Sequence, residues 1–149
     1  MRITKRCQYA LRAVFELAIR DSGQPVKIQE IAGAQNIPPR FLEVILNELR
    51  HAGFVESRRG NEGGYILARK AGALTVGEVI QYIQGPISKS IHKELKADNS
   101  QYFYGDYAFE NLWENVNDAI SQVCDNTTFA DLVEYEKAEK PNSVSSYSI

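Results

Sequence analysis

The chain has 149 residues, of which 44% are hydrophobic and 24% are charged, which is typical of a soluble globular protein. This length suits one domain, or a small domain with an appended arm. No apolar run approaches the roughly 20 residues of a membrane helix, and the charged N-terminus is unlike a signal peptide. The two cysteines are too few for a disulfide framework or a four-ligand zinc site. We therefore expect a cytoplasmic protein.

The net charge of −2 is unevenly distributed along the chain. Residues 1–71 contain 12 Lys+Arg and 7 Asp+Glu, a net charge of +5, whereas residues 72–149 contain 5 and 12, a net charge of −7. A basic half joined to an acidic half is expected when one part binds a polyanion and the other has a different role. The alternative is a chance asymmetry on a solvated surface.

Apolar residues at three- and four-residue spacing predict four helices in the first part of the chain. These helices cover residues 4–21, 28–35, 39–51 and 75–84. Thr4 can cap the first helix. Pro38 and Pro39 mark a tight turn before the third, because Pro38 disfavours a helical residue before it and Pro39 suits a first helical turn. The predicted buried side of the third helix comprises Phe41, Leu42, Ile45, Leu46 and Leu49.

A predicted β-hairpin follows the third helix. Residues 54–58 and 64–68 have the composition of strands, and residues 59–63 form the glycine-containing tip between them. Helix, turn, helix and hairpin in this order indicate a winged helix-turn-helix domain over residues 1–85. The predicted fold is therefore mainly α with a small β-hairpin wing.

The second part of the chain is dominated by one long predicted helix, residues 106–124, about 28 Å in length. Its broad apolar face comprises Phe109, Leu112, Trp113, Val116, Ile120 and Val123. Thr127 or Thr128 can cap a final helix over residues 129–138. The polar, serine-rich residues 139–149 are predicted to form a loose tail.

The outward side of the third helix carries residues suited to reading bases in a major groove. The candidates for base contact are Pro38, Arg40, Glu43 and Val44, with Asn47 and Arg50 further along the helix. Arg40 can donate to guanine, Glu43 can accept from cytosine, and Arg50 is placed to meet a phosphate. The alternative for Glu43 is a surface charge or an intrahelical partner of Arg40 or Arg50.

Further candidates for DNA contact lie on the wing and at the start of the first helix. They are Lys5, Arg6, Arg58, Arg59, Asn61 and Tyr65. Glycines at the tip allow a close approach to DNA, and paired arginines suit phosphates or a narrow minor groove. The free N–H groups of a helix N-terminus also favour a phosphate. Taken singly, these residues can equally be solvated surface charges.

Residues 1–85 resemble the Rrf-two family of bacterial winged-helix transcription factors. The resemblance rests on MRITKRCQYALRA, IQEIAGAQNIPPRFLEVILNELRHAGFVESRRG, GGYILAR and LTVGEVIQYIQGP, and the long helix followed by TFADLVE also fits. It implies a sequence-specific repressor that grips a near-palindromic operator in double-stranded DNA. It also implies a homodimer that pairs through helices 106–138, with the apolar face of the long helix as its interface. The implied DNA contacts fall on Pro38, Arg40, Glu43, Val44, Arg59 and the start of the first helix.

The chain departs from the cluster-binding members of that family. Those members place three cysteines in the loop before the dimer helix, whereas the corresponding residues 86–107 contain none. We therefore expect no iron–sulfur cluster, no other cofactor and no metal. Cys7 and Cys124 are expected to be buried, and a redox role for either is the alternative.

Residues 86–105 are predicted to form a linker loop and a candidate effector surface. The candidate effector residues in and beside it are His92, Tyr102, Tyr104 and Tyr107. Alternatively, these aromatics pack the loop onto Phe109 and Trp113. Two function classes are open, a dimeric DNA-binding repressor and a winged-helix protein-interaction module. No nucleophile–base pair or phosphate-binding loop predicts an enzyme.

Overall fold

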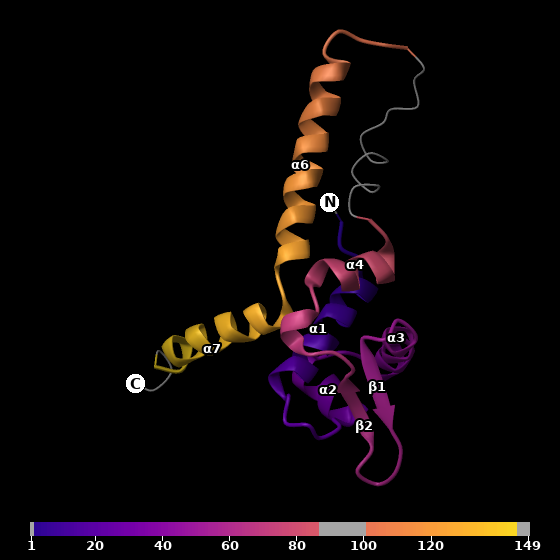
Figure 1. The fold of residues 1–149 in the computed structure, drawn as a ribbon, viewed down its shortest axis with the longest axis vertical. Coiled ribbons are helices and arrows are strands. Elements are labelled where there is room, and N and C mark those ends of the chain that lie inside the picture. Colours follow the sequence, from indigo (N-terminus) through magenta and orange to yellow (C-terminus); the bar gives the residue numbers. More distant parts are fainter. Residues whose placement is uncertain (1, 87–100, 146–149) are drawn as a thin grey trace.

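Helices dominate the fold, and one β-hairpin interrupts them in the part of the chain that the structure describes (Figure 1). The structure, a computed structural model, describes residues 2–86 and 101–145. The elements in chain order are α1 (Lys5–Ile19), α2 (Ile28–Gln35), α3 (Pro39–His51), β1 (Val55–Arg58), β2 (Gly64–Leu67), the 3-10 helix η1 (Ala71–Ala73), α4 (Val76–Gln84), α6 (Asp106–Asn126) and α7 (Phe129–Ser145). The predicted mainly helical, winged fold is confirmed.

The helix boundaries follow from local caps. The Thr4 hydroxyl accepts a hydrogen bond from the Cys7 backbone N–H at 3.1 Å and so caps α1. Asn36 ends α2 in the left-handed conformation, with φ of 52°, which asparagine tolerates better than most residues. Pro39 then occupies the first position of α3, where its missing N–H is not needed.

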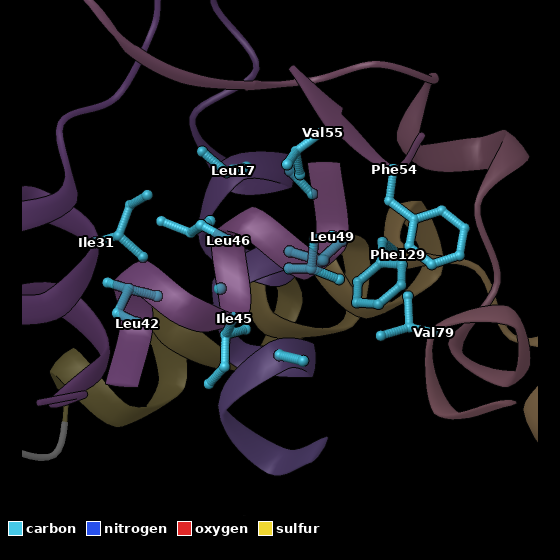
Figure 2. Close-up of a cluster of buried hydrophobic side chains, with 14 of the residues drawn as sticks. Leu17, Ile31, Leu42, Ile45, Leu46, Leu49, Phe54, Val55, Val79 and Phe129 are labelled. Atoms are coloured by element: carbon cyan, nitrogen blue, oxygen red, sulfur yellow. The ribbon is translucent and has the colours of Figure 1, made fainter. Parts of the chain in front are cut away.

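The hydrophobic core lies where α1 packs against α2, α3 and α4. Figure 2 shows its centre, where Leu42, Ile45, Leu46 and Leu49 from α3 meet Leu17, Ile31, Val55 and Val79. Phe129 lies in the same cluster and is completely buried, although it comes after α6 in the chain. The start of α7 therefore completes the core of the winged domain.

Phe41 differs from the prediction. It was expected on the buried side of α3, yet its side chain is 61% exposed. The cause is the angular position of Phe41 on the helix. At about 100° per residue, Phe41 lies roughly 90° from the centre of the buried side. An aromatic residue is thereby left on the surface next to Arg40.

The wing is a two-stranded antiparallel hairpin that pairs Val55 with Leu67 and Arg58 with Gly64. Val26 pairs with the β2 strand of this hairpin, because it exchanges two backbone hydrogen bonds of 2.8 Å with Tyr65. A Cβ on Gly64 would overlap the Val26 carbonyl, so glycine permits this close approach. The wing is therefore attached to the segment that precedes α2.

The last two helices, α6 and α7, leave the body of the molecule in different directions. In Figure 1, α6 rises from the body of the molecule and α7 projects to one side. Thr128 and Asp131 cap the start of α7 through hydrogen bonds of 3.1 Å and 2.9 Å. The helix continues through Ser145, beyond the residue 138 predicted as its end, and so extends into the predicted tail 139–149. No helix in the described part of the chain is long and apolar enough to cross a membrane.

Candidate nucleic-acid interface

The outward side of α3 presents the predicted base-reading residues to solvent. Pro38, Arg40, Glu43 and Val44 are all exposed, with 59% of Val44 accessible. The opposite side of α3 is anchored in the core, so these side chains stand on a firmly held helix. Further along, Arg50 donates a hydrogen bond of 2.7 Å to the Asn47 side chain. This bond joins the two candidates of the last turns to each other.

The tip of the wing is the second part of the candidate interface. Arg58, Arg59 and Asn61 are exposed there. Tyr65 is half-buried and packs against the core, and its backbone pairs with Val26, which precedes α2. The structure therefore places the two arginines and Asn61 at the surface, and makes Tyr65 in part a structural residue.

The start of α1 is the third part, and its two cations differ in their surroundings. The Lys5 ammonium lies 5.5 Å from the centre of the Tyr9 ring, within the range of a cation–π contact. Arg6 donates to Glu48 of α3, from Nε at 3.2 Å and also from Nη2. Sequence reasoning missed this pair, because 42 positions separate the partners and no local pattern links them.

Three exposed arginines of the candidate interface are suited to phosphate contact. Within residues 2–86 and 101–145, Arg40, Arg58 and Arg59 take part in no ion pair. They lie on α3 and the wing, the two elements that a winged helix directs at DNA. Arg69, by contrast, is engaged by Glu78 at 3.1 Å. The candidate interface thus keeps these three positive charges without a carboxylate partner among the described residues.

Both thiols lie in surroundings that raise their pKa values. Cys7 is completely buried, and burial raises its pKa from 9.0 to about 11. Cys124 is half-buried rather than buried as expected, and burial and the nearby Asp125 raise its pKa as well. Because a metal binds the thiolate, both surroundings oppose metal binding. Among the described residues, no three His, Cys, Asp or Glu side chains lie together as ligands.

The aromatic residues before and at the start of α6 lie on the surface. Tyr102, Tyr104 and Tyr107 are 54%, 103% and 72% exposed. Tyr102 and Tyr107 contact each other, with ring centroids 4.8 Å apart. They are therefore not packed away against Phe109, which is itself exposed. His92, the remaining candidate effector residue, lies outside the described residues.

The apolar face of α6 is largely uncovered. Phe109, Leu112 and Val123 are exposed, whereas Trp113 and Val116 are half-buried. Ile120 is also half-buried and packs against the core of the winged domain. The structure thus leaves five of the six predicted interface residues outside that core.

Comparisons with known proteins agree with this geometry. The Rrf2 family, described as "Iron-dependent Transcriptional regulator", matches residues 3–135. The HTH-type transcriptional regulator CymR of Bacillus subtilis (strain 168) is 34% identical over 140 residues, which is 94% of this chain and 95% of CymR. The HTH-type transcriptional regulator IscR of Citrobacter koseri is 31% identical over 134 residues, covering 89% of this chain and 80% of IscR.

Solved structures show the same similarity. The structure of CymR (YrzC), the global cysteine regulator of B. subtilis, superposes with a TM-score of 0.77 and 32% identity, covering 91% of this chain and 98% of CymR. The structure of T. potens IscR superposes with a TM-score of 0.73 and 33% identity, covering 95% and 90% of the two chains.

Proposed function

Because the chain belongs to the Rrf2 family of transcriptional regulators, and is thus a DNA-binding regulator, we propose that it represses transcription as a homodimer on a near-palindromic operator. A regulator of this kind acts in the cytoplasm, where bacterial DNA is found.

The observation that carries the proposal is the outward side of α3. Arg40, Glu43 and Val44 are exposed there on a helix whose other side is buried. Arginine pairs with the O6 and N7 atoms of guanine, and glutamate accepts from the N4 amino group of cytosine. Arg58 and Arg59 on the wing supply phosphate contacts. This set of residues supports recognition of a G·C-containing half-site.

The apolar face of α6 supports dimerisation. Phe109, Leu112 and Val123 are large apolar side chains that the described part of the chain leaves exposed. A second copy of α6 would cover them, because an isologous interface brings the same patch together from both subunits. In such a dimer the recognition helices lie about 34 Å apart, one turn of DNA. The alternative, a winged-helix protein-interaction module, needs neither this spacing nor free arginines.

The cysteine inventory supports regulation without an iron–sulfur cluster. Clusters are held by several thiolates, commonly four, whereas this chain has two cysteines. Cys7 is buried in the core and Cys124 lies at the end of α6. These residues do not fit a cluster held within one subunit. Freshly purified protein should show no visible absorption band and no bound iron, and a brown chromophore would contradict this part of the proposal.

The exposed aromatic residues support a regulatory signal other than an iron–sulfur cluster. Tyr102, Tyr104 and Tyr107 present an aromatic surface before and at the start of α6, suited to a small-molecule or protein effector that contacts the loop 86–107. Replacing Tyr102 and Tyr104 with alanine should leave folding and DNA binding unchanged. If induction is also unchanged in cells, this surface does not receive the signal.

Selection from random-sequence duplexes, followed by affinity measurements, tests the DNA-binding function. Wild-type protein should enrich a paired half-site, and its affinity should fall steeply with salt. Arg40→Ala should lose about 1–3 kcal/mol on that site and become less selective at one base pair. Arg20→Ala, which removes a cation held by Glu16 and Glu30, is the charge-matched control. Equal affinity for selected and random DNA would exclude a sequence-specific regulator.

A further inference from the structure

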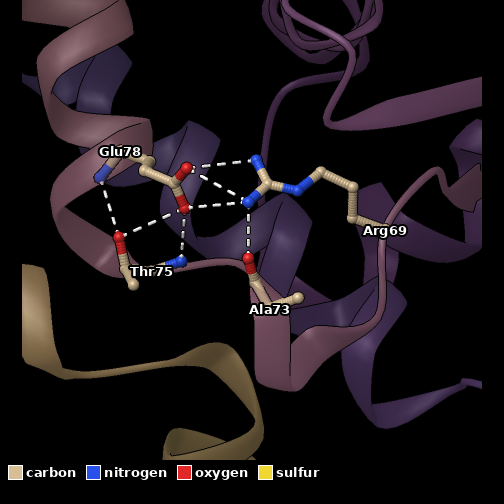
Figure 3. A network of polar contacts seen from close by, with 4 residues as sticks. All are labelled: Arg69, Ala73, Thr75 and Glu78. Carbon is tan, nitrogen blue, oxygen red and sulfur yellow. Dashed lines mark hydrogen bonds and ion pairs between the residues drawn. The ribbon is translucent and has the colours of Figure 1, made fainter.

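The first turn of α4 is joined to the wing by an ion pair. Arg69, two residues after β2, donates from Nη1 and Nη2 to Glu78 Oε1, both at 3.1 Å, and also donates to the Ala73 carbonyl (Figure 3). Glu78 Oε2 accepts from the Thr75 N–H at 3.0 Å. The hydrogen bond from the Thr75 backbone and the Arg69 guanidinium keep the pKa of Glu78 below its ordinary value. Glu78 therefore remains ionised at neutral pH and connects the wing to α4.

The same turn is joined to the end of α6 through the backbone. The Val76 N–H donates to the Thr127 carbonyl at 2.9 Å, and the Phe129 N–H donates to the Leu74 carbonyl at 3.0 Å. Between them, Thr75 and Thr128 form an antiparallel bridge. Residues 74–76 and 127–129 are thus paired across more than fifty positions of sequence. Because Phe129 is fully buried, this pairing is fastened to the core.

Gly77 allows α4 and α6 to approach closely. A Cβ at this position would overlap Asp125 Oδ1 and lie 3.1 Å from the Asp125 Cα. The carboxylate could rotate away, but the Cα belongs to the backbone of α6 and cannot move without moving that helix. A side chain at Gly77 would therefore change the angle or the separation of α4 and α6.

These three connections meet at one place, which we call the α4 junction: Arg69, Gly77 and Glu78 with the paired segments 74–76 and 127–129. In Figure 1, the tip of the wing and the far end of α6 lie at opposite ends of the molecule. A helix of 21 residues is about 31 Å long, so a tilt of roughly 5° moves its far end by about 3 Å. Such a displacement is close to the 3.4 Å rise of one base pair.

We propose that the α4 junction sets the distance between the two DNA-binding surfaces of the dimer, and that Arg69, Gly77 and Glu78 are positioning residues for operator half-site spacing. The inference rests on the dimeric DNA-binding function proposed above. None of the three residues needs to touch DNA, because Gly77 sets how α4 packs against α6, and Arg69 and Glu78 set how the wing is joined to α4. A purely structural role would alter stability and leave the preferred spacing unchanged.

The first test compares wild-type protein with Gly77→Ala by selection from a pool of random-sequence duplexes. Gly77→Ala should enrich the same half-site sequence with a spacing that is shifted or broadened by at least one base pair. On the wild-type spacing its affinity should fall on the order of tenfold, while its affinity for a duplex with a single half-site stays within about twofold. Gly33→Ala is the matched control, because it adds a methyl group to a helix with nothing within 4 Å.

A second set of variants acts on the ion pair and keeps the proposal testable if Gly77→Ala does not fold. Arg69→Gln, Glu78→Gln and the double variant should show the same change of spacing, since each removes the same interaction. The amide oxygen of Glu78→Gln can still accept from Thr75 and preserve the start of α4. If the folded variants all keep the wild-type spacing and affinity, the inference is wrong. If wild-type protein itself selects no paired half-sites, the proposed dimeric function fails first, and the inference fails with it.

Discussion

At the scale of single residues, the Cys7 thiol is a titratable group that is completely buried. Its pKa of about 11, against an ordinary 9.0, means that the folded protein holds the thiol proton more tightly than the unfolded chain does. The resulting stabilisation is fully present below pH 9 and is lost as pH rises through 11. Cys7 is therefore an inert core residue at neutral pH rather than a reactive thiol.

This property predicts an alkaline loss of stability. Between pH 9.0 and about 11, the free energy of unfolding should fall by roughly 2–3 kcal/mol more in wild-type protein than in Cys7→Ala. Urea unfolding across this range measures the difference. Cys124→Ala, which removes the less buried thiol, should retain most of the decrease. Parallel pH profiles for wild type and Cys7→Ala would contradict the buried neutral thiol.

The ion pair between Arg6 and Glu48 affects how much positive charge is available to DNA. Both side chains are accessible, at 55% and 27%, so the pair contributes at most about 1 kcal/mol to folding. We expect its larger effect to be on DNA binding, because Glu48 neutralises a cation at the start of α1, one of the proposed contact regions. The proposed DNA-binding surface thus has one available positive charge fewer than the sequence suggests.

Glu48→Ala should therefore strengthen DNA binding at low salt. The freed Arg6 can neutralise one more phosphate, which would steepen the dependence of log K on log salt by up to about 0.9. Affinity measurements at several salt concentrations give this slope. Asp21→Ala, which removes an exposed carboxylate from the connection between α1 and α2, controls for net charge. A slope equal to that of wild type would show that Arg6 meets no phosphate.

At the scale of elements, α7 belongs to the winged domain as much as to the second half of the chain. Phe129 is 0% exposed and Val133 is 8% exposed, and the helix packs against α1 and η1. Further along, Tyr135 is 70% exposed. The start of α7 is therefore a core element, and the part around Tyr135 is solvated.

Two substitutions on this helix should differ sharply in their effects on stability. Phe129→Ala should lower the free energy of unfolding by about 3–5 kcal/mol, because it removes a completely buried ring and leaves a cavity. Tyr135→Ala removes a ring of similar size from the surface and should change stability by no more than about 0.5 kcal/mol. Urea unfolding followed by circular dichroism compares the two. Equal losses would mean that Phe129 is not part of the winged core.

For the whole molecule, the charge distribution and the exposed face of α6 suggest how two copies sit on DNA. The net charge is +5 over residues 1–71 and −7 over residues 72–149. Since the acidic part is repelled by phosphates, the dimer should direct its α6 helices away from the duplex. The exposed Phe109, Leu112 and Val123 are then free to meet a second copy.

Phe109→Asp should accordingly convert the protein from dimer to monomer in sedimentation experiments. Operator affinity should fall by two orders of magnitude or more, because a monomer loses the effective concentration that binds the second half-site. Asn111→Asp places the same carboxylate on the opposite side of α6 and should stay dimeric. A Phe109→Asp protein that remains dimeric would show that another surface forms the interface.

The local features of the fold could be predicted from the sequence. Thr4, Asn36 and Pro39 act within one helical turn of their positions, so spacing and residue type alone place the ends of α1, α2 and α3. The same local rules predicted the hairpin and put Arg40 and Glu43 on the outer side of α3. Phe41 was misplaced because it lies at the edge of the buried side, where periodicity does not decide exposure.

By itself, then, the sequence determined the winged helix-turn-helix order and the basic and acidic halves, and it supplied the candidate residues for DNA contact. Only the tertiary structure decided that Arg6 is paired with Glu48, that Phe129 completes the winged core and that Gly77 lies against Asp125. Each of these contacts joins residues more than forty positions apart. Helix periodicity and capping act over a few residues, whereas such contacts depend on how complete elements pack, and no short-range pattern encodes that packing.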